Sequence, residues 1–368
     1  MAEKVKLGII GVGQIGKSHI NTYKTIPDAD IVAVADINEA EAKRVAAANN
    51  IPHILTRFRD LLKMDEIDAV DVCLHNNYHA PVTIAALEAG KHVYCEKPMA
   101  GAYPDARKMY ETAKKCGKKL SIQLSTLFSK ETKAAKRLID EGYVGKIYFA
   151  KSYGHRRRGR PWVDGYGSPA FVTKKNAQGG ALYDMGVYHI SNILYLVGNP
   201  EILTVSGATH DEIDKYEDRA KAAPWEVEEL GLGFARLGGG ISFVIEESWA
   251  IHSSGTDSPL IAGSKGGIKL APFGYFATVA DMPMDATFDL AGSDWRWHAC
   301  FPTEACYDGP QQHWIAALLG RVPFIDTAAI ALATMKISEG IYMSQKLGKE
   351  VTGADIEKKS KSTALKGL

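Results

Sequence analysis

The stretch VKLGIIGVGQIGKSHI, residues 5–20, decides the fold of this chain. It begins with a run of mostly apolar, β-branched residues, which predicts a buried strand. The pattern Gly11-x-Gly13-x-x-Gly16 follows at once, and residues able to open a helix come after it. In such a strand, turn and helix, Gly11 makes the tight turn, Gly13 lets a pyrophosphate approach the backbone, and Gly16 lets the helix pack on the strand.

A second apolar run, DIVAVADI, places Asp36 about 20 residues after the glycines, where a carboxylate binds the ribose hydroxyls of a dinucleotide. This spacing favours a dinucleotide site over an ordinary strand-to-helix turn. Asp36 would repel a 2′-phosphate, and Ile37 and Asn38 offer no cation to bind one. We therefore expect NAD as the cofactor, with NADP disfavoured, and expect Gln14, Ile15 and Ile37 to line its site.

The residues up to 124 continue to alternate strand patterns with helix patterns. Short links between them predict a parallel, doubly wound sheet, in which ligands bind beyond the carboxyl ends of the strands. The residues at or just after such ends are the further candidates for cofactor binding: Leu74, His75, Asn76, His79, Glu96, Lys97 and Gln123. A role without function is an equally good interpretation for the two histidines: His75 would then be a solvated loop residue, and His79 a residue at the start of a helix.

Charge and cysteine content exclude several classes of protein. The 368 residues carry a net charge of +1, so global charge does not favour nucleic acid as a partner. Five widely spaced cysteines without a C-x-x-C pair indicate neither a disulfide framework nor a metal site. The first residues are too polar for a signal peptide, and no run is long enough to span a membrane. We expect a cytoplasmic protein with a small-molecule partner.

Three segments together resemble the glucose-fructose oxidoreductase, inositol dehydrogenase and rhizopine-catabolism (Gfo/Idh/MocA) family. They are the glycine turn, NNYHAPVTIAALEAGKHVYCEKPMA at 76–100, and GGALYDMGVYHISNILYLVG at 179–198. The resemblance implies an α/β chain with an NAD-binding Rossmann domain at 1–124. It also implies a substrate-binding domain at 125–368 with a large, open, mostly antiparallel sheet. Such a sheet often joins subunits, so a homodimer or homotetramer is expected.

The sequence of the second part agrees with this expectation. Residues 229–252 read as two strands joined at Gly238–Gly240, and residues 260–273 read as a further hairpin. Residues 309–351 predict two closing helices. An open sheet needs a cover, and a partner subunit supplies one.

Within the CEKP motif, the resemblance implies a cis peptide before Pro98, with Lys97 pointing at the nicotinamide and the substrate. A lysine there polarises a substrate hydroxyl and helps to carry its proton, especially if burial lowers its pKa. Glu96 would line the cofactor side. The alternative is that Lys97 only pairs with a surface carboxylate.

The segment at 179–198 departs from the family pattern Asp-x-Gly-x-His, in which the carboxylate orients an imidazole base. Four residues after Asp184 stands Tyr188, and His189 follows about 140° around a regular α-helix from Asp184. We expect Lys97, Asp184 and Tyr188 to handle the proton. His189 is the reserve candidate if the helix is distorted. Whether a tyrosine acts as base or only donates a hydrogen bond is left open.

A long loop, HRRRGRPWVDGYGSPAFV at 155–172, fits no regular element. Trp162 and Tyr166 would stack on the apolar face of a sugar ring. Arg156 is a candidate for substrate binding. Alternatively, the arginines of this loop would bind a phosphorylated substrate, hold a subunit contact or make structural salt bridges; they are Arg156, Arg157, Arg158 and Arg160. His313, at the start of a predicted helix, is either a substrate contact or a solvated histidine.

Three functions remain open at this stage. The first is an NAD-dependent oxidoreductase that takes a hydride from a secondary ring hydroxyl, C3 being one candidate, of a sugar, glycoside or cyclitol and gives a keto-sugar. The second is a glycosidase-like enzyme that retains NAD and uses transient C3 oxidation for elimination. The third is a non-catalytic, NAD-binding regulatory protein.

Overall fold

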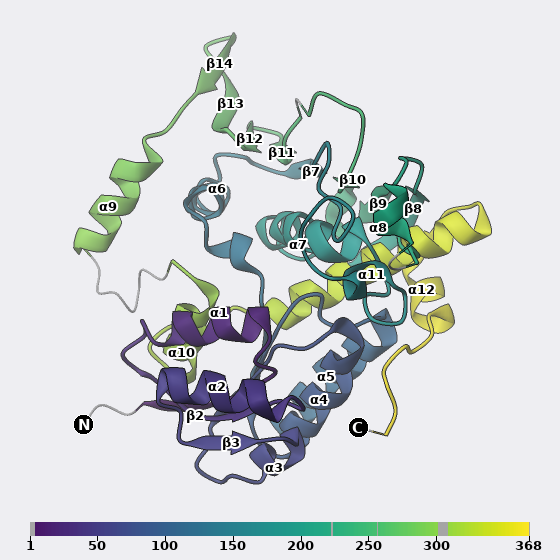
Figure 1. The fold of residues 1–368 in the computed structure, drawn as a ribbon. Helices are drawn as coiled ribbons and strands as arrows, with labels where there is room; N and C mark the ends of the chain where they lie inside the picture. Colours follow the sequence, from purple (N-terminus) through teal and green to yellow (C-terminus); the bar gives the residue numbers. More distant parts are fainter. Residues whose placement is uncertain (1–3, 222–223, 256, 301–307, 368) are drawn as a thin grey trace.

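The computed structural model describes residues 4–221, 224–255, 257–300 and 308–367 (Figure 1). Two sheets organise the described chain, one of six strands and one of nine. The first is parallel throughout and the second is mostly antiparallel, which confirms the α/β architecture predicted from the sequence.

The six-stranded sheet has the order β3-β2-β1-β4-β5-β6. Its strands are β1 Val5–Ile10, β2 Ala29–Ala35, β3 His53–Leu55, β4 Ala69–Val72, β5 His92–Cys95 and β6 Leu120–Ile122. The helices between them are α1 Gln14–Tyr23, α2 Glu39–Asn49, α3 Phe58–Leu62, α4 Asn76–Glu88 and α5 Tyr103–Cys116. The chain reverses its direction of progress across the sheet between β1 and β4, so the ligand crevice opens at the carboxyl ends of these two strands.

The nine-stranded sheet has the order β14-β13-β12-β11-β7-β10-β9-β8-β15. Its strands are β7 Ile147–His155, β8 Ile202–His210, β9 Leu230–Leu237, β10 Ile241–Ser248, β11 Leu260–Gly263, β12 Gly266–Leu270, β13 Phe273–Val279, β14 Met282–Ala286 and β15 Val351–Thr352. The turn at Gly238–Gly240 and the β11–β12 hairpin lie where the sequence predicted them. Strands β7 and β10 run parallel at its centre.

The remaining helices are α6 Lys130–Asp140, α7 Val187–Leu196, α8 Glu217–Ala220, α9 Leu290–Cys300, α10 Pro310–Leu318, α11 Thr327–Leu347 and α12 Gly353–Lys359. Helix α11 contacts α5 of the first domain as well as α7 and β8 of the second, so it ties the domains together. Helix α10 joins the Rossmann core, where Trp314 and Ile315 pack with Ile20 and Tyr23. The hydrophobic core of the Rossmann domain therefore includes residues from beyond position 124.

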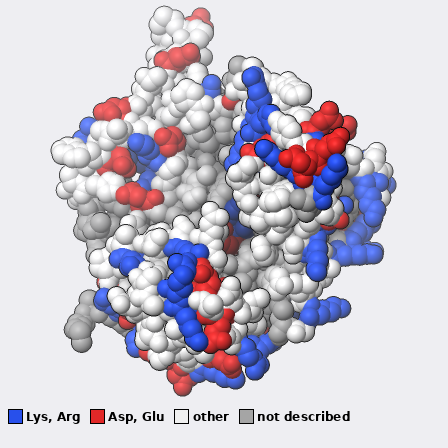
Figure 2. Space-filling view, viewed as in Figure 1, with Lys and Arg blue, Asp and Glu red and all other residues white. Residues whose placement is uncertain are grey.

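A hollow opens between the two domains on the face shown in Figure 2, and charged side chains of both signs are interspersed around it. Among the described residues, no helix combines the length and apolar character that crossing a membrane requires.

Candidate functional site

The glycine turn between β1 and α1 has the shape that the sequence predicted. Gly11 has a φ of 91°, and a Cβ there would lie 2.4 Å from the Cys73 carbonyl oxygen. A Cβ on Gly16 would lie 2.0 Å from the Gly11 carbonyl oxygen, so this helix packs against the turn only with glycine. A Cβ on Gly13 would meet nothing within 4 Å. The turn therefore leaves open space in front of the helix N-terminus, where a pyrophosphate fits.

Asp36 is fixed beside this turn at the end of β2. Its two carboxylate oxygens accept hydrogen bonds of 2.8 Å from the backbone N–H groups of Val12 and Asn38. Ile37 is 95% exposed and Ile15 is 45% exposed. The carboxylate and these uncovered apolar side chains have the character of a ribose and adenine site, and their contact with NAD stays a prediction.

The other candidates at the strand ends separate into accessible and enclosed residues. His75 is exposed, and the polar side chains of Asn76 and Gln123 are half-buried. His79 is fully buried, and its ring nitrogens lie 2.7 Å from the Pro98 carbonyl oxygen and 2.9 Å from that of Leu74. Because burial lowers the pKa of His79, the neutral ring donates to one of them. The prediction of a cofactor contact by the His79 side chain is corrected, because the side chain is enclosed between the Pro98 carbonyl of the CEKP loop and the Leu74 carbonyl.

Lys97 reaches across from the Rossmann domain to Asp184 in the second domain. Its Nζ donates hydrogen bonds of 2.8 Å to the Asp184 Oδ1 and to the Asp184 backbone oxygen. The peptide between Lys97 and Pro98 is cis. Burial acts to lower the pKa of Lys97, but the Asp184 carboxylate outweighs it and the pKa is raised. The lowering of this pKa that the sequence analysis considered is not found, and the ion pair with Asp184 favours the ammonium form of Lys97.

A buried ionic cluster lies behind Lys97. Glu96 Oε1 lies 2.8 Å from His19 Nε2, and the other nitrogen of His19 lies 2.8 Å from Asp71. Burial opposes a charge on this ring, but Asp71 raises the pKa of His19 well above its usual range. Glu96 also accepts a hydrogen bond of 3.0 Å from the Lys97 backbone N–H. The cluster thus fixes the backbone from which Lys97 extends.

The segment that carries Asp184 is not a regular α-helix, and this corrects the angle expected from the sequence. Residues Leu182–Gly186 form a π-helical turn, and α7 begins directly after it. A π turn holds one more residue per hydrogen-bonded ring than an α turn. Of residues 181–190, only Asp184, Tyr188 and His189 are not buried. The π turn therefore brings all three to the accessible side, including the two that lie five positions apart.

Tyr188 and His189 differ in their readiness to accept a proton. The Tyr188 ring centroid lies 4.9 Å from the Lys97 Nζ. Burial raises the pKa of Tyr188 against the lowering effect of Lys97, so its hydroxyl stays protonated. His189 Nδ1 lies 2.8 Å from Glu247 Oε2. Within the described residues, the His189 Nε2 has no hydrogen-bond partner, and this side chain is 29% exposed. His189 is thus the better placed acceptor.

Asp184 is held by two donors, neither of which is the imidazole. Besides the bond from Lys97, its Oδ2 accepts one of 3.0 Å from Trp249 Nε1. Burial acts to raise the pKa of Asp184, but Lys97 outweighs it and the pKa is lowered. The carboxylate that contacts His189 is Glu247, which the sequence reasoning missed. Its signal is the alternation of β10, in which Glu247 follows Phe243 and Ile245 on the buried face.

The long loop brings Arg156 and Tyr166 to the same site. The Arg156 Nη1 donates a hydrogen bond of 2.9 Å to the Tyr166 hydroxyl, and this guanidinium acts electrostatically on both Asp184 and His189. Burial and then Asp184 raise the pKa of Tyr166. Trp162 packs in a hydrophobic cluster that includes Trp249. Its Nε1 donates a hydrogen bond of 3.0 Å to the Arg219 backbone oxygen.

Two further candidates, Arg160 and His313, have buried side chains. Arg160 is 1% exposed and pairs with Asp164 and Glu229. His313 is also 1% exposed. It accepts a hydrogen bond of 3.1 Å from the backbone of Ile325 and packs against the Phe128 ring. The prediction of a substrate contact by His313 is therefore corrected, because its side chain is enclosed in the core.

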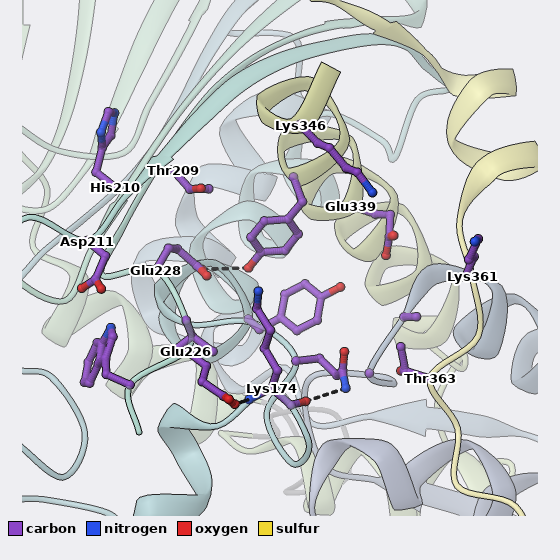
Figure 3. Close-up of a pocket in the computed structure, with 17 residues that line it drawn as sticks. Lys174, Thr209, His210, Asp211, Glu226, Glu228, Glu339, Lys346, Lys361 and Thr363 are labelled. Carbon is purple, nitrogen blue, oxygen red and sulfur yellow. Dashed lines mark hydrogen bonds between the residues drawn. The ribbon is translucent and has the colours of Figure 1, made fainter. Parts of the chain in front are cut away.

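Two cavities lie on opposite sides of the π turn. A small one is bounded by Lys97, Asp184 and Trp249, among others. The larger one, about 740 Å³, is called the rear cavity here; it lies between α11, the end of β8 and the loop 225–228 (Figure 3). Tyr183 lines both. In the wall of the rear cavity, Glu228 accepts hydrogen bonds from the backbone of Gly180 and Leu182 and from the Tyr342 hydroxyl.

Comparison with known families agrees with this geometry. Residues 5–124 match the model of an oxidoreductase family with an NAD-binding Rossmann fold, and residues 132–269 match the GFO/IDH/MocA C-terminal domain. The chain belongs to the GFO/IDH/MocA family of oxidoreductases. The NAD-binding domain predicted from the glycine turn is thereby confirmed.

Several relatives are named as dehydrogenases of a glucoside, of levoglucosan or of inositol. D-glucoside 3-dehydrogenase of Escherichia coli is 30% identical over 276 residues, which cover 73% of this chain and 77% of that protein. Levoglucosan dehydrogenase of Pseudarthrobacter phenanthrenivorans is 30% identical over 53% of this chain and 52% of its own length. Among solved structures, levoglucosan dehydrogenase in complex with NADH and levoglucosan superposes with a TM-score of 0.77 at 21% identity, over 95% of this chain and 99% of that chain.

Proposed function

We propose that this GFO/IDH/MocA protein is an NAD-dependent dehydrogenase that oxidises a secondary ring hydroxyl of a sugar, glycoside or cyclitol to a ketone. The observation that carries the proposal is the Lys97–Asp184 ion pair at the edge of the NAD-binding sheet. Arg156 acts electrostatically on both Asp184 and His189, and the His189 Nε2 has no hydrogen-bond partner among the described residues. Oxidation of an alcohol is assisted by a donor to its oxygen and by an acceptor for its proton.

Each side chain has a separate task in this reaction. The Lys97 ammonium donates to the substrate oxygen and stabilises the negative charge that develops there. The hydroxyl proton leaves to His189 Nε2. NAD, held by the glycine turn and Asp36, would supply the acceptor for the hydride of the carbinol carbon, so that a C=O bond remains. Asp184 keeps Lys97 charged and oriented through its 2.8 Å contact. The Tyr188 hydroxyl remains protonated and serves as a second donor.

Arg156 and Tyr166 supply the contacts that hold the substrate ring. Both side chains lie near Asp184, and a tyrosine face suits the apolar face of a pyranose. We take the C3 hydroxyl as the first candidate, supported by the similarity to D-glucoside 3-dehydrogenase and levoglucosan dehydrogenase. A homodimer or homotetramer through the open face of the nine-stranded sheet is proposed as the assembly.

The test is NADH absorbance with a panel of free sugars, glycosides and inositols, with NAD and NADP supplied separately. Lys97→Met keeps an unbranched side chain that is one atom shorter and removes its charge, so the rate should fall about 10³-fold. A wild-type signal for one substrate class that disappears in this variant supports the proposal. Release of an aglycone without net NADH would favour the NAD-retaining glycosidase, and firm NAD binding without turnover of any compound would favour a regulatory protein.

A further inference from the structure

We infer that Glu247 is the positioning residue that makes His189 the proton acceptor, replacing the family arrangement in which Asp184 would orient the imidazole. The inference rests on the proposed dehydrogenase function. It assigns a task to a buried carboxylate that lies outside the Lys97–Asp184 pair.

Glu247 is fully buried and has two hydrogen-bond partners. Its Oε2 lies 2.8 Å from His189 Nδ1, and its Oε1 accepts a hydrogen bond from the Ser152 hydroxyl. An ionised carboxylate accepts only, so the Nδ1 of His189 must carry the hydrogen. In the neutral ring this leaves the lone pair on Nε2, the nitrogen that has no partner in the described part of the chain.

The backbone is shaped to hold this pair. Strands β7 and β10 run parallel with Gly154 opposite Glu247. A Cβ at position 154 would lie 2.1 Å from Glu247 Oε2 and 2.5 Å from His189 Nδ1, so only glycine leaves room for the contact. Gly186 of the π turn lies on the other side, where a Cβ would come 3.0 Å from Glu247 Cγ. A site of this tightness fixes the imidazole in one orientation.

The π turn explains why a second carboxylate is needed. Asp184 uses its oxygens on Lys97 and Trp249, and His189 stands five positions later instead of four. The extra residue of the π turn keeps His189 on the accessible side, and Glu247 on the neighbouring strand takes over its orientation. One carboxylate thus serves the ammonium and the other serves the imidazole.

The charged groups acting on His189 are Glu247 on β10 and Arg156 after β7. Burial and Arg156 lower the pKa of His189, but Glu247 outweighs them and the pKa is raised above 6.5. Only the neutral ring accepts a proton, so oxidation should be lost as pH falls through this raised pKa. Removing the charge of Glu247 should move that acidic limb to lower pH.

The experiment compares wild type with Glu247→Gln, which keeps the size and removes the charge. We expect kcat to fall about 10²-fold with little change in KM, and the acidic limb to shift to lower pH. Ser152→Ala should shift the acidic limb to higher pH, because a Glu247 carboxylate with one donor fewer holds the imidazolium of His189 more strongly. Glu246→Gln is the matched control: it is the adjacent residue on β10, pairs with Lys151 and should leave the pH profile unchanged.

Nitrogen-15 spectra of histidine-labelled protein give a readout that is independent of turnover. The His189 signals, identified by their loss in His189→Gln, should show hydrogen on Nδ1 in the wild type and a lower titration midpoint in Glu247→Gln. An unchanged pH profile together with an unchanged titration of His189 in this variant would overturn the inference. Failure of the proposed function would look different, because the wild-type enzyme itself would then form no NADH.

Discussion

The two sides of the π turn each hold a carboxylate surrounded by donors, yet the two acids have opposite properties. At the front, Asp184 accepts from the Lys97 ammonium and the Trp249 indole, and its pKa is lowered. At the rear, Glu228 accepts from two backbone N–H groups and the Tyr342 hydroxyl. Burial raises the pKa of Glu228 because none of these donors carries a full charge.

The opposite pKa shifts of Asp184 and Glu228 distinguish a carboxylate at the reacting site from one that stabilises the backbone behind it. An ion pair at the accessible front keeps a proton donor charged next to the place where substrate charge develops. The rear carboxylate instead satisfies the backbone N–H groups of Gly180 and Leu182, where the π turn begins. The size of a cavity does not reveal this division, since the rear cavity is the larger of the two.

Of the substitutions that test the contrast between Asp184 and Glu228, Asp184→Asn should reduce turnover most. Without its main counter-charge the pKa of Lys97 should fall, and kcat should fall about 10²-fold at neutral pH. Activity should also gain an alkaline limb, because an uncharged lysine no longer stabilises the developing oxyanion. A pH profile of kcat checks this. Trp249→Phe, which removes the uncharged donor to the same carboxylate, is the control and should create no such limb.

A smaller effect on turnover, but a larger one on stability, should come from Glu228→Gln. The amide offers one acceptor oxygen where the carboxylate has two, so a buried N–H group of Gly180 or Leu182 loses its partner. The cost should be about 1–3 kcal/mol in the free energy of unfolding. Urea unfolding measures it, and Glu226→Gln at the same cavity is the exposed control. A loss of turnover in Glu228→Gln equal to that of Asp184→Asn, with unchanged stability, would contradict the structural role assigned to Glu228.

The Rossmann half and its turn were predictable because their constraints are local in sequence. Gly11 and Gly16 stand where a Cβ has no room, Gly13 leaves open space for a ligand, and Asp36 follows at a fixed spacing along the next strand. The large antiparallel sheet of the second domain was implied only by family resemblance, and the order of its strands was not predicted. That order depends on pairings between strands far apart in sequence, such as β10 with β7.

The candidate site was predictable in its members but not in their arrangement. Lys97 and Asp184 follow from motifs, whereas the π turn, which begins where Glu228 accepts from Gly180 and Leu182, cannot be read from helical periodicity. The raised pKa of Lys97 depends on a partner 87 positions away. His79 and His313 show the reverse error, since residues at the starts of helices can have side chains that point into the core.

The smallest expected effect belongs to Lys346→Ala at the rear cavity. Lys346 extends from α11 toward this cavity in Figure 3, and within the described residues it makes no ion pair. Removing an exposed side chain of this kind should change stability by less than about 0.5 kcal/mol. It should also leave kcat and KM unchanged, because only the front of the π turn faces the reacting groups. Steady-state kinetics of Lys346→Ala on the substrate found in the panel test this prediction. A large loss of activity would mean that the rear cavity takes part in the reaction, and the separation of the two sides would then be wrong.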